Sequence, residues 1–177
     1  MIFKPTDVVP QLTRLILENR HVERWVFKID GDIGGRGIAY FDLIGNEPIS
    51  KLIREPKPAN SGEKTQEKFT GDIYEEVQRS LSKLLPKKLI IVKPGVYKDY
   101  FHFIDELCKR GGVIESSPSS ITKEVNSIGV LFQLDADGEV EIQTTYERIV
   151  SSPFSPAGFR FPQKILPNLN VSCYFIS

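Results

Sequence analysis

Apolar residues recur at helical spacing in three stretches of the chain. The first is Val8–Asn19, where the apolar residues lie three or four positions apart. The second is Asp72–Leu85, which places its aliphatic side chains on one helical face, and Pro86 is expected to end it. The third, Asp99–Lys109, is followed by Gly111-Gly112, a pair typical of a helix C-terminus. The pattern therefore predicts three amphipathic helices.

Shorter apolar runs, several of them rich in aromatic residues, predict strands between and after these helices. The expected strands are Trp25–Ile29, Ile38–Ile44, a short one within Lys87–Gly95, one beginning at Val113-Ile114, Ser127–Leu134 and Glu139–Val150. The last two flank Asp137-Gly138, and an Asp-Gly pair favours a tight antiparallel hairpin. Residues 55–67 have no periodicity and are expected to form an exposed loop, and no element is predicted beyond Ser151. The fold class expected is α+β.

Composition narrows the class of protein. The length of 177 residues fits a single domain, and 23 basic against 23 acidic residues argue against a nucleic-acid binder that relies on bulk charge. No apolar run approaches the roughly 18–20 residues that span a bilayer, and no signal peptide is recognisable, so we expect a cytoplasmic protein without membrane contact. Neither Cys108 and Cys173 nor His21 and His102 have zinc-ligand spacing, so no metal site is expected.

Four glycines lie close together in Gly31–Gly37, between two predicted strands. Glycine permits positive φ and lets backbone N–H groups approach a phosphate. A dinucleotide-binding loop joins a strand to a helix, and a Walker loop ends in Gly-Lys-Ser/Thr, so both are excluded. A kinase loop is excluded because Lys28 precedes the glycines and no HRD or DFG occurs. An ordinary glycine-containing hairpin with an exposed lysine stays open as the alternative.

The segment VFKIDGDIGGRGIAYFD resembles the lid region of the ATP-grasp family, in which a strand lysine precedes a glycine loop. The resemblance implies that Lys28 holds the α- and β-phosphates of ATP and that Arg36 touches the γ-phosphate. The glycines that would fold over the phosphoryl groups are Gly31, Gly34, Gly35 and Gly37. No catalytic residue is assigned.

The segment RGGVIE resembles the hinge between the two lobes of ATP-grasp proteins. By this resemblance the backbone of Val113 and Ile114 pairs with the adenine edge, and the Glu115 carboxylate accepts the ribose hydroxyls. The alternative for Glu115 is a strand-end carboxylate in solvent. The order of lysine strand, glycine loop, helix, strand, helix and glutamate favours the nucleotide site.

Later motifs resemble one branch of the family, the ATP-grasp-like region of IQ motif-containing protein H, and more distantly the pheganomycin-type ATP-grasp peptide ligases. The motifs are Gly111–Glu115, Asp137-Gly138, Thr144–Glu147 and Phe161-Pro162, and the resemblance covers about residues 20–165. It implies one ATP-grasp-like domain over residues 1–177. Residues 20–115 would form the lid-type lobe, and 116–177 the start of a second, truncated lobe.

The resemblance also implies ATP and Mg²⁺ as cofactors, although the Glu-x-Asn strand that supplies magnesium ligands in the family is not evident here. The expected function is therefore that of an ATP-binding part of a carboxylate–amine ligase-type protein, inactive alone. The alternative is a non-catalytic interaction or scaffold domain with the same fold. Family members carry a calmodulin-binding IQ motif elsewhere, and no IQxxxRGxxxR pattern occurs here, so a protein partner would act through a longer native chain.

Overall fold

The structure is a computed structural model that describes residues 4–54, 71–117 and 127–164. The chain divides into two compact units, Met1–Ile121 and Thr122–Ser177. Helices and antiparallel sheets occur together, which confirms the α+β class. The loop expected at residues 55–67 lies outside the described residues.

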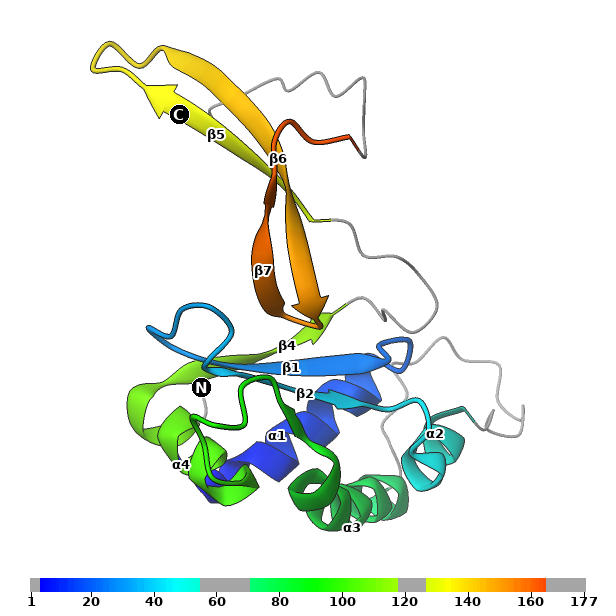
Figure 1. Cartoon of the computed structure of the whole chain (residues 1–177). Coiled ribbons are helices and arrows are strands. Elements are labelled where there is room, and N and C mark those ends of the chain that lie inside the picture. The colour runs from blue at the N-terminus through cyan, green and yellow to red at the C-terminus, as the bar shows by residue number, and fades with distance from the viewer. Residues whose placement is uncertain (1–3, 55–70, 118–126, 165–177) are drawn as a thin grey trace, which may run out of the picture. The chain divides into compact units, whose positions relative to one another are not determined.

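The first unit is a four-stranded antiparallel sheet covered by helices. Its elements in chain order are α1 (Pro5–Glu18), β1 (Arg24–Ile29), β2 (Ile38–Asp42), α2 (Glu47–Arg54), α3 (Gly71–Lys88), β3 (Ile90–Ile91), α4 (Tyr100–Arg110) and β4 (Gly112–Ser117). The strand order is β3-β2-β1-β4, so β1 lies between β2 and β4. All the described helices of this unit lie on one face of the sheet (Figure 1). We call the opposite face the helix-free face.

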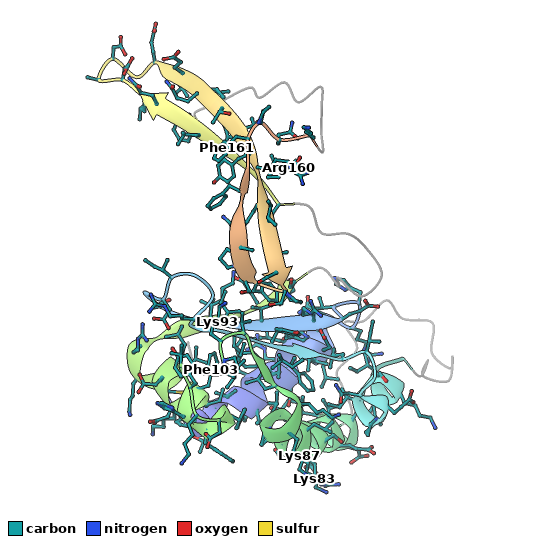
Figure 2. The ribbon with its side chains drawn as sticks, in the orientation of Figure 1. Lys83, Lys87, Lys93, Phe103, Arg160 and Phe161 are labelled. Atoms are coloured by element: carbon teal, nitrogen blue, oxygen red, sulfur yellow. The ribbon has the colours of Figure 1, made fainter. Side chains whose placement is uncertain are left out.

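Strand alternation divides β1 between these two faces. Successive side chains of a strand point to opposite sides, so Trp25, Phe27 and Ile29 share the face that meets the helices, and all three are buried. Phe103 of α4 lies in the interior of the unit (Figure 2) and is fully buried. The helices contribute many further buried side chains, among them Val8, Leu12, Ile16, Ile49, Val77, Leu81, Leu85 and Leu107.

Two helices differ from the sequence-based prediction. α2 was not predicted, because its eight residues supply little more than two turns of periodicity, yet Ile49 and Ile53 are buried. α3 continues through Pro86 to Lys88 instead of ending before the proline. Proline has a helical φ, and its missing N–H removes one helical hydrogen bond, to the carbonyl four residues earlier.

The ends of α4 follow the expected capping chemistry. The Asp99 carboxylate accepts a hydrogen bond from the backbone N–H of His102 at 2.9 Å, as an N-cap residue does. At the other end Gly111 has a φ of 86°, a conformation that side chains disfavour. β4 begins immediately afterwards, so this glycine turns the chain from helix to strand.

The second unit is a three-stranded antiparallel sheet. It contains β5 (Ile128–Leu134), β6 (Val140–Ser152) and β7 (Ser155–Arg160) in the order β5-β6-β7. The predicted Asp137-Gly138 hairpin joins β5 to β6, and Gly138 has a φ of 89°. β7 was not predicted, because its sequence SPAGFR contains proline and glycine and has no alternating pattern. Aromatic side chains pack beside it, with the ring of Tyr146 5.4 Å from that of Phe161 (labelled in Figure 2).

Candidate functional site

Lys28 and Glu115, far apart in sequence, form an ion pair between Lys28 Nζ and Glu115 Oε1. β1 and β4 are antiparallel neighbours, with Val26 directly opposite Glu115 and Lys28 opposite Val113. The two charged side chains are therefore diagonal neighbours on the helix-free face. Their side chains are 42% and 45% exposed, respectively. The structure thus brings together the two residues for which the sequence predicted phosphate and ribose contacts.

The glycine segment, residues 30–37, joins β1 to β2 at the end of β1 that carries Lys28. Gly31, Gly34 and Gly35 have φ values of 74°, 71° and 79°, in the left-handed region that favours glycine. Arg36 is exposed, and its Nε donates a long hydrogen bond of 3.4 Å to the carbonyl of Ile33 within the segment. Where a residue in this conformation adjoins one in the right-handed region, successive backbone N–H groups can converge on one point, an arrangement that binds anions.

Gly37 has a different structural reason to be glycine. A Cβ added at this position would lie 2.6 Å from the side chain of Asp32, closer than real Cβ contacts. Its absence leaves the space that the Asp32 carboxylate fills. The last glycine of the segment therefore accommodates an acidic side chain from within the same segment.

Asp32 is held by two residues that the sequence analysis did not identify. The hydroxyl of Tyr97 donates to Asp32 Oδ2 at 2.7 Å, and Nη2 of Arg110 donates to Asp32 Oδ1 at 2.8 Å. The hydrogen bond from Arg110, followed by that from Tyr97, lowers the pKa of the Asp32 carboxyl below its ordinary value. Burial, together with the hydrogen bond to Asp32, raises the pKa of Tyr97 to about 12.

The backbone N–H and C=O groups of Val113 and Ile114 face opposite sides of β4. The amide of Asp30 donates to the carbonyl of Gly111 at 3.0 Å. In an antiparallel ladder every second residue bonds the same neighbour, so the backbone groups of Val113 and Glu115 face β1. Those of Ile114 face the outer edge of β4, which is an edge strand of this sheet. Ile114 therefore presents a donor and an acceptor at the edge, whereas Val113 presents an exposed apolar side chain on the helix-free face.

Arg24 is a further charged residue of the helix-free face, and the sequence analysis missed it. Its guanidinium donates to both carboxylate oxygens of Asp42, at 2.5 and 2.9 Å, and lies 4.5 Å from the centre of the Tyr40 ring. Arg24 is only 4% exposed, and the hydrogen bond to Asp42 raises its pKa. A lone arginine before an aromatic strand carries no signal of such a pairing, because the partner comes from the neighbouring strand.

In the second unit, Glu147 lies in the Thr144–Glu147 motif singled out by the sequence analysis. It is buried and its carboxylate contacts Nη1 of Arg160 at 3.1 Å and the backbone N–H of Lys164. These contacts join β6 to β7 and the residues after it. Within this unit Glu147 therefore has a structural role.

In the described part of the chain, no group of three or more His, Cys, Asp or Glu side chains could hold a metal ion. None of the helices in residues 4–54, 71–117 and 127–164 is both long and apolar enough to cross a membrane.

Comparison with known proteins gives two matches. The model of the family described as IQCH-like, ATP-grasp matches residues 1–177. IQ motif-containing protein H of Danio rerio is 30% identical over 134 residues, which are 73% of this chain and 12% of that protein. The chain thus spans about an eighth of the length of this relative. No solved structure matches the chain significantly.

Proposed function

Because the chain belongs to the IQCH-like ATP-grasp family, we propose that it binds ATP on the helix-free face of its first unit. One observation carries this proposal: Lys28 and Glu115 lie side by side on that face, next to the glycine segment. A basic group, a carboxylate and the backbone amides of glycines match the phosphates and ribose hydroxyls of a nucleotide.

Lys28 and Glu115 would exchange partners when ATP binds. The phosphates offer Lys28 an anion with more charge than one carboxylate, and the ribose hydroxyls are donors that Glu115 can accept. Because both side chains are half exposed, their mutual ion pair is worth only about 0–1 kcal/mol, so it is a weak competitor for the nucleotide.

The glycine segment would surround the phosphoryl groups. The amides of Gly31, Gly34, Gly35 and Gly37 are the proposed donors, and the guanidinium of Arg36 would reach the γ-phosphate. The long hydrogen bond of Arg36 leaves most of its five N–H donors for a ligand. Donors fixed in the backbone before binding lose little entropy when the anion arrives.

The outer edge of β4 would recognise the base. Adenine has a donor and an acceptor on one edge, and the backbone of Ile114 presents the complementary acceptor and donor outward. We assign the backbone contact to Ile114 and an apolar contact with the adenine ring to Val113, whose side chain is exposed on the helix-free face.

Mg²⁺ would enter with the nucleotide, because divalent cations bind phosphate oxygens readily. The described residues offer no cluster of carboxylates for it. ATP-dependent carboxylate–amine ligation is therefore proposed for a longer protein that contributes magnesium ligands, and we assign no catalytic residue in this chain. The cytoplasmic location likewise stays a prediction.

Calorimetric titration with magnesium-ATP tests the proposal. We expect binding in the micromolar to low-millimolar range, and Lys28→Ala should weaken it by about 1.5–3 kcal/mol, the range for a charge-assisted hydrogen bond. Lys83→Ala is the matched control, because Lys83 is exposed and extends from α3 away from the sheet (Figure 2). A folded wild-type protein that releases no heat and shows no thermal shift would refute nucleotide binding.

A non-catalytic interaction domain is the second candidate, and the second unit favours it. Phe132, Leu134 and Ile142 are exposed there, and the register pairs Phe132 with Ile142 on one face of the sheet. Adjacent exposed apolar side chains are typical of protein-interaction surfaces. If this function is the right one, Lys28→Ala will leave the interactions of the longer protein unchanged.

A further inference from the structure

We propose that Asp32, Tyr97 and Arg110, here called the Asp32 clamp, hold the glycine segment in the conformation that receives the phosphates of ATP. The inference rests on the proposed nucleotide-binding function and assigns positioning roles to three residues that do not themselves contact the ligand. It starts from an unusual feature of the segment, a partly buried carboxylate among glycines.

The clamp is built from rigid parts of the first unit. Tyr97 is 4% exposed, and its ring packs edge-on against Phe103 at 5.1 Å, a fully buried residue of α4. The core therefore fixes the position of the Tyr97 hydroxyl. Arg110 is the last residue of α4, whereas Tyr97 lies just before the N-cap residue Asp99, so the two donors flank this helix.

The hydrogen bonds hold the segment at two points. Each oxygen of the Asp32 carboxylate accepts one hydrogen bond, from Tyr97 and Arg110 respectively. Nη2 of Arg110 also donates to the backbone carbonyl of Asp30 at 3.0 Å. The Arg110 guanidinium thus contacts the segment at both Asp30 and Asp32.

The glycines make such a restraint necessary. Glycine loses more conformational freedom on ordering than any other residue, and three glycines of this segment have positive φ. The ladder hydrogen bonds hold only the two ends, for example from the amide of Ile29 to the carbonyl of Gly37 at 2.8 Å. A restraint at Asp32 orders the interior of the segment before the nucleotide binds, which reduces the entropy lost on binding.

The ion pair also serves the electrostatics of the site. An unpaired carboxylate in the segment would repel phosphates, whereas Arg110 neutralises Asp32 at 2.8 Å. The space left by the missing Cβ of Gly37 lets the carboxylate turn toward Arg110 and Tyr97. The segment therefore retains an anchoring carboxylate with little net negative charge.

The test compares wild type, Asp32→Ala and Tyr97→Phe in two measurements. The first is the affinity for magnesium-ATP and for adenosine, which lacks phosphates. Because the variants lose a restraint on the segment, the ATP affinity should be about tenfold weaker in Asp32→Ala and about threefold weaker in Tyr97→Phe. The affinity for adenosine should change less than about twofold. Asp105→Ala, which removes an aspartate of α4 that pairs with Lys109 instead, is the control.

The second measurement is amide hydrogen exchange without ligand. Exchange in residues 31–37 should accelerate about tenfold in Asp32→Ala while α1 stays protected. Unchanged exchange there, or equal losses for ATP and adenosine, would overturn the clamp. If wild-type protein does not bind ATP, the proposed function fails, and the exchange data still decide whether the clamp orders the segment. If Asp32→Ala does not fold, Tyr97→Phe carries both measurements, because it retains the contact with Arg110.

Discussion

Single residues of the helix-free face show how strand pairing creates a charged yet ordered surface. Arg24 is buried, but Asp42 supplies both oxygens of its carboxylate and Tyr40 supplies a ring face. A guanidinium in this setting depends on its partner, since a buried charge without one is costly. The same logic applies to Asp32, which depends on Tyr97 and Arg110.

Asp42→Asn should lower the free energy of unfolding by about 3 kcal/mol, because it removes the charge of the carboxylate that pairs with the buried Arg24 guanidinium. Urea denaturation followed by fluorescence measures this change. Trp25 is the single tryptophan of the sequence and is buried next to Arg24 in β1, so it reports directly on this strand. Asp105→Asn, on the exposed side of α4, should change stability by less than about 0.5 kcal/mol. Equal effects of the two substitutions would contradict the prediction.

Tyr97 should make stability depend on pH in the alkaline range. Its pKa is raised from 10.0 to about 12, so the fold favours the neutral phenol. Its contribution to stability is complete below pH 10 and is lost as the pH rises through about 12. Phenolate absorbance of wild type and Tyr97→Phe checks this prediction, because the difference between the two titrations isolates Tyr97. A midpoint near 10 in the folded protein would show that the hydroxyl is not held by Asp32.

At the scale of elements, the junction between α4 and β4 decides which face Glu115 occupies. A Cβ on Gly112 would lie 2.1 Å from the carbonyl oxygen of Lys28 and 2.4 Å from Leu107 Cδ1. The absence of a side chain thus lets β4 approach β1 closely. A slip of one residue would move Glu115 to the other face of the sheet, away from Lys28.

Gly112→Ala should therefore destabilise the protein by about 1–3 kcal/mol, the usual range for overpacking a close contact. It should also weaken nucleotide binding, because β4 must move away from β1. Gly95→Ala is the matched control: a Cβ there meets no atom within 4 Å, so stability should stay within about 0.5 kcal/mol of wild type. The measurement is the urea denaturation midpoint of each variant. Similar midpoints for Gly112→Ala and Gly95→Ala would show that β4 can accommodate a methyl group.

At the scale of the whole molecule, the main hydrophobic core belongs to the first unit alone. The buried members of the core cluster run from Val8 to Leu107, all within Met1–Ile121. In the second unit, by contrast, large apolar side chains such as Phe132 and Leu134 are exposed. The lid-type lobe at residues 20–115 and the second lobe at 116–177 stay predictions. The two compact units, Met1–Ile121 and Thr122–Ser177, are a separate observation.

Residues 1–121 should accordingly fold without the rest of the chain. We expect one cooperative urea transition, monitored by Trp25 fluorescence, with a midpoint close to that of the full chain, because the core is complete within this unit. Full-length protein measured in parallel is the control. A fragment with a gradual, non-cooperative change would show that the second unit is needed for folding.

Local patterns were sufficient to locate the elements whose signal lies within a few turns or residues of the chain. The periodicities of α1, α3 and α4, the paired runs of β1 and β2, and the Asp-Gly hairpin are examples. Short motifs also singled out Lys28, the glycines and Glu115, and their roles in nucleotide binding stay predictions. Short or irregular elements such as α2 and β7 were missed, because burial and pairing rather than periodicity stabilise them.

Contacts between distant segments were decided by the pairing of β1 with β2 and β4. The pairing places Lys28 beside Glu115 and Arg24 beside Asp42. It also directs the backbone groups of Val113 toward β1 and those of Ile114 toward the outer edge of the sheet. The packing of α4 and of the residues just before it brings Arg110 and Tyr97 to Asp32. No local pattern encodes these contacts, because strand register and helix packing depend on which long-range arrangement buries the most apolar surface and satisfies its polar groups.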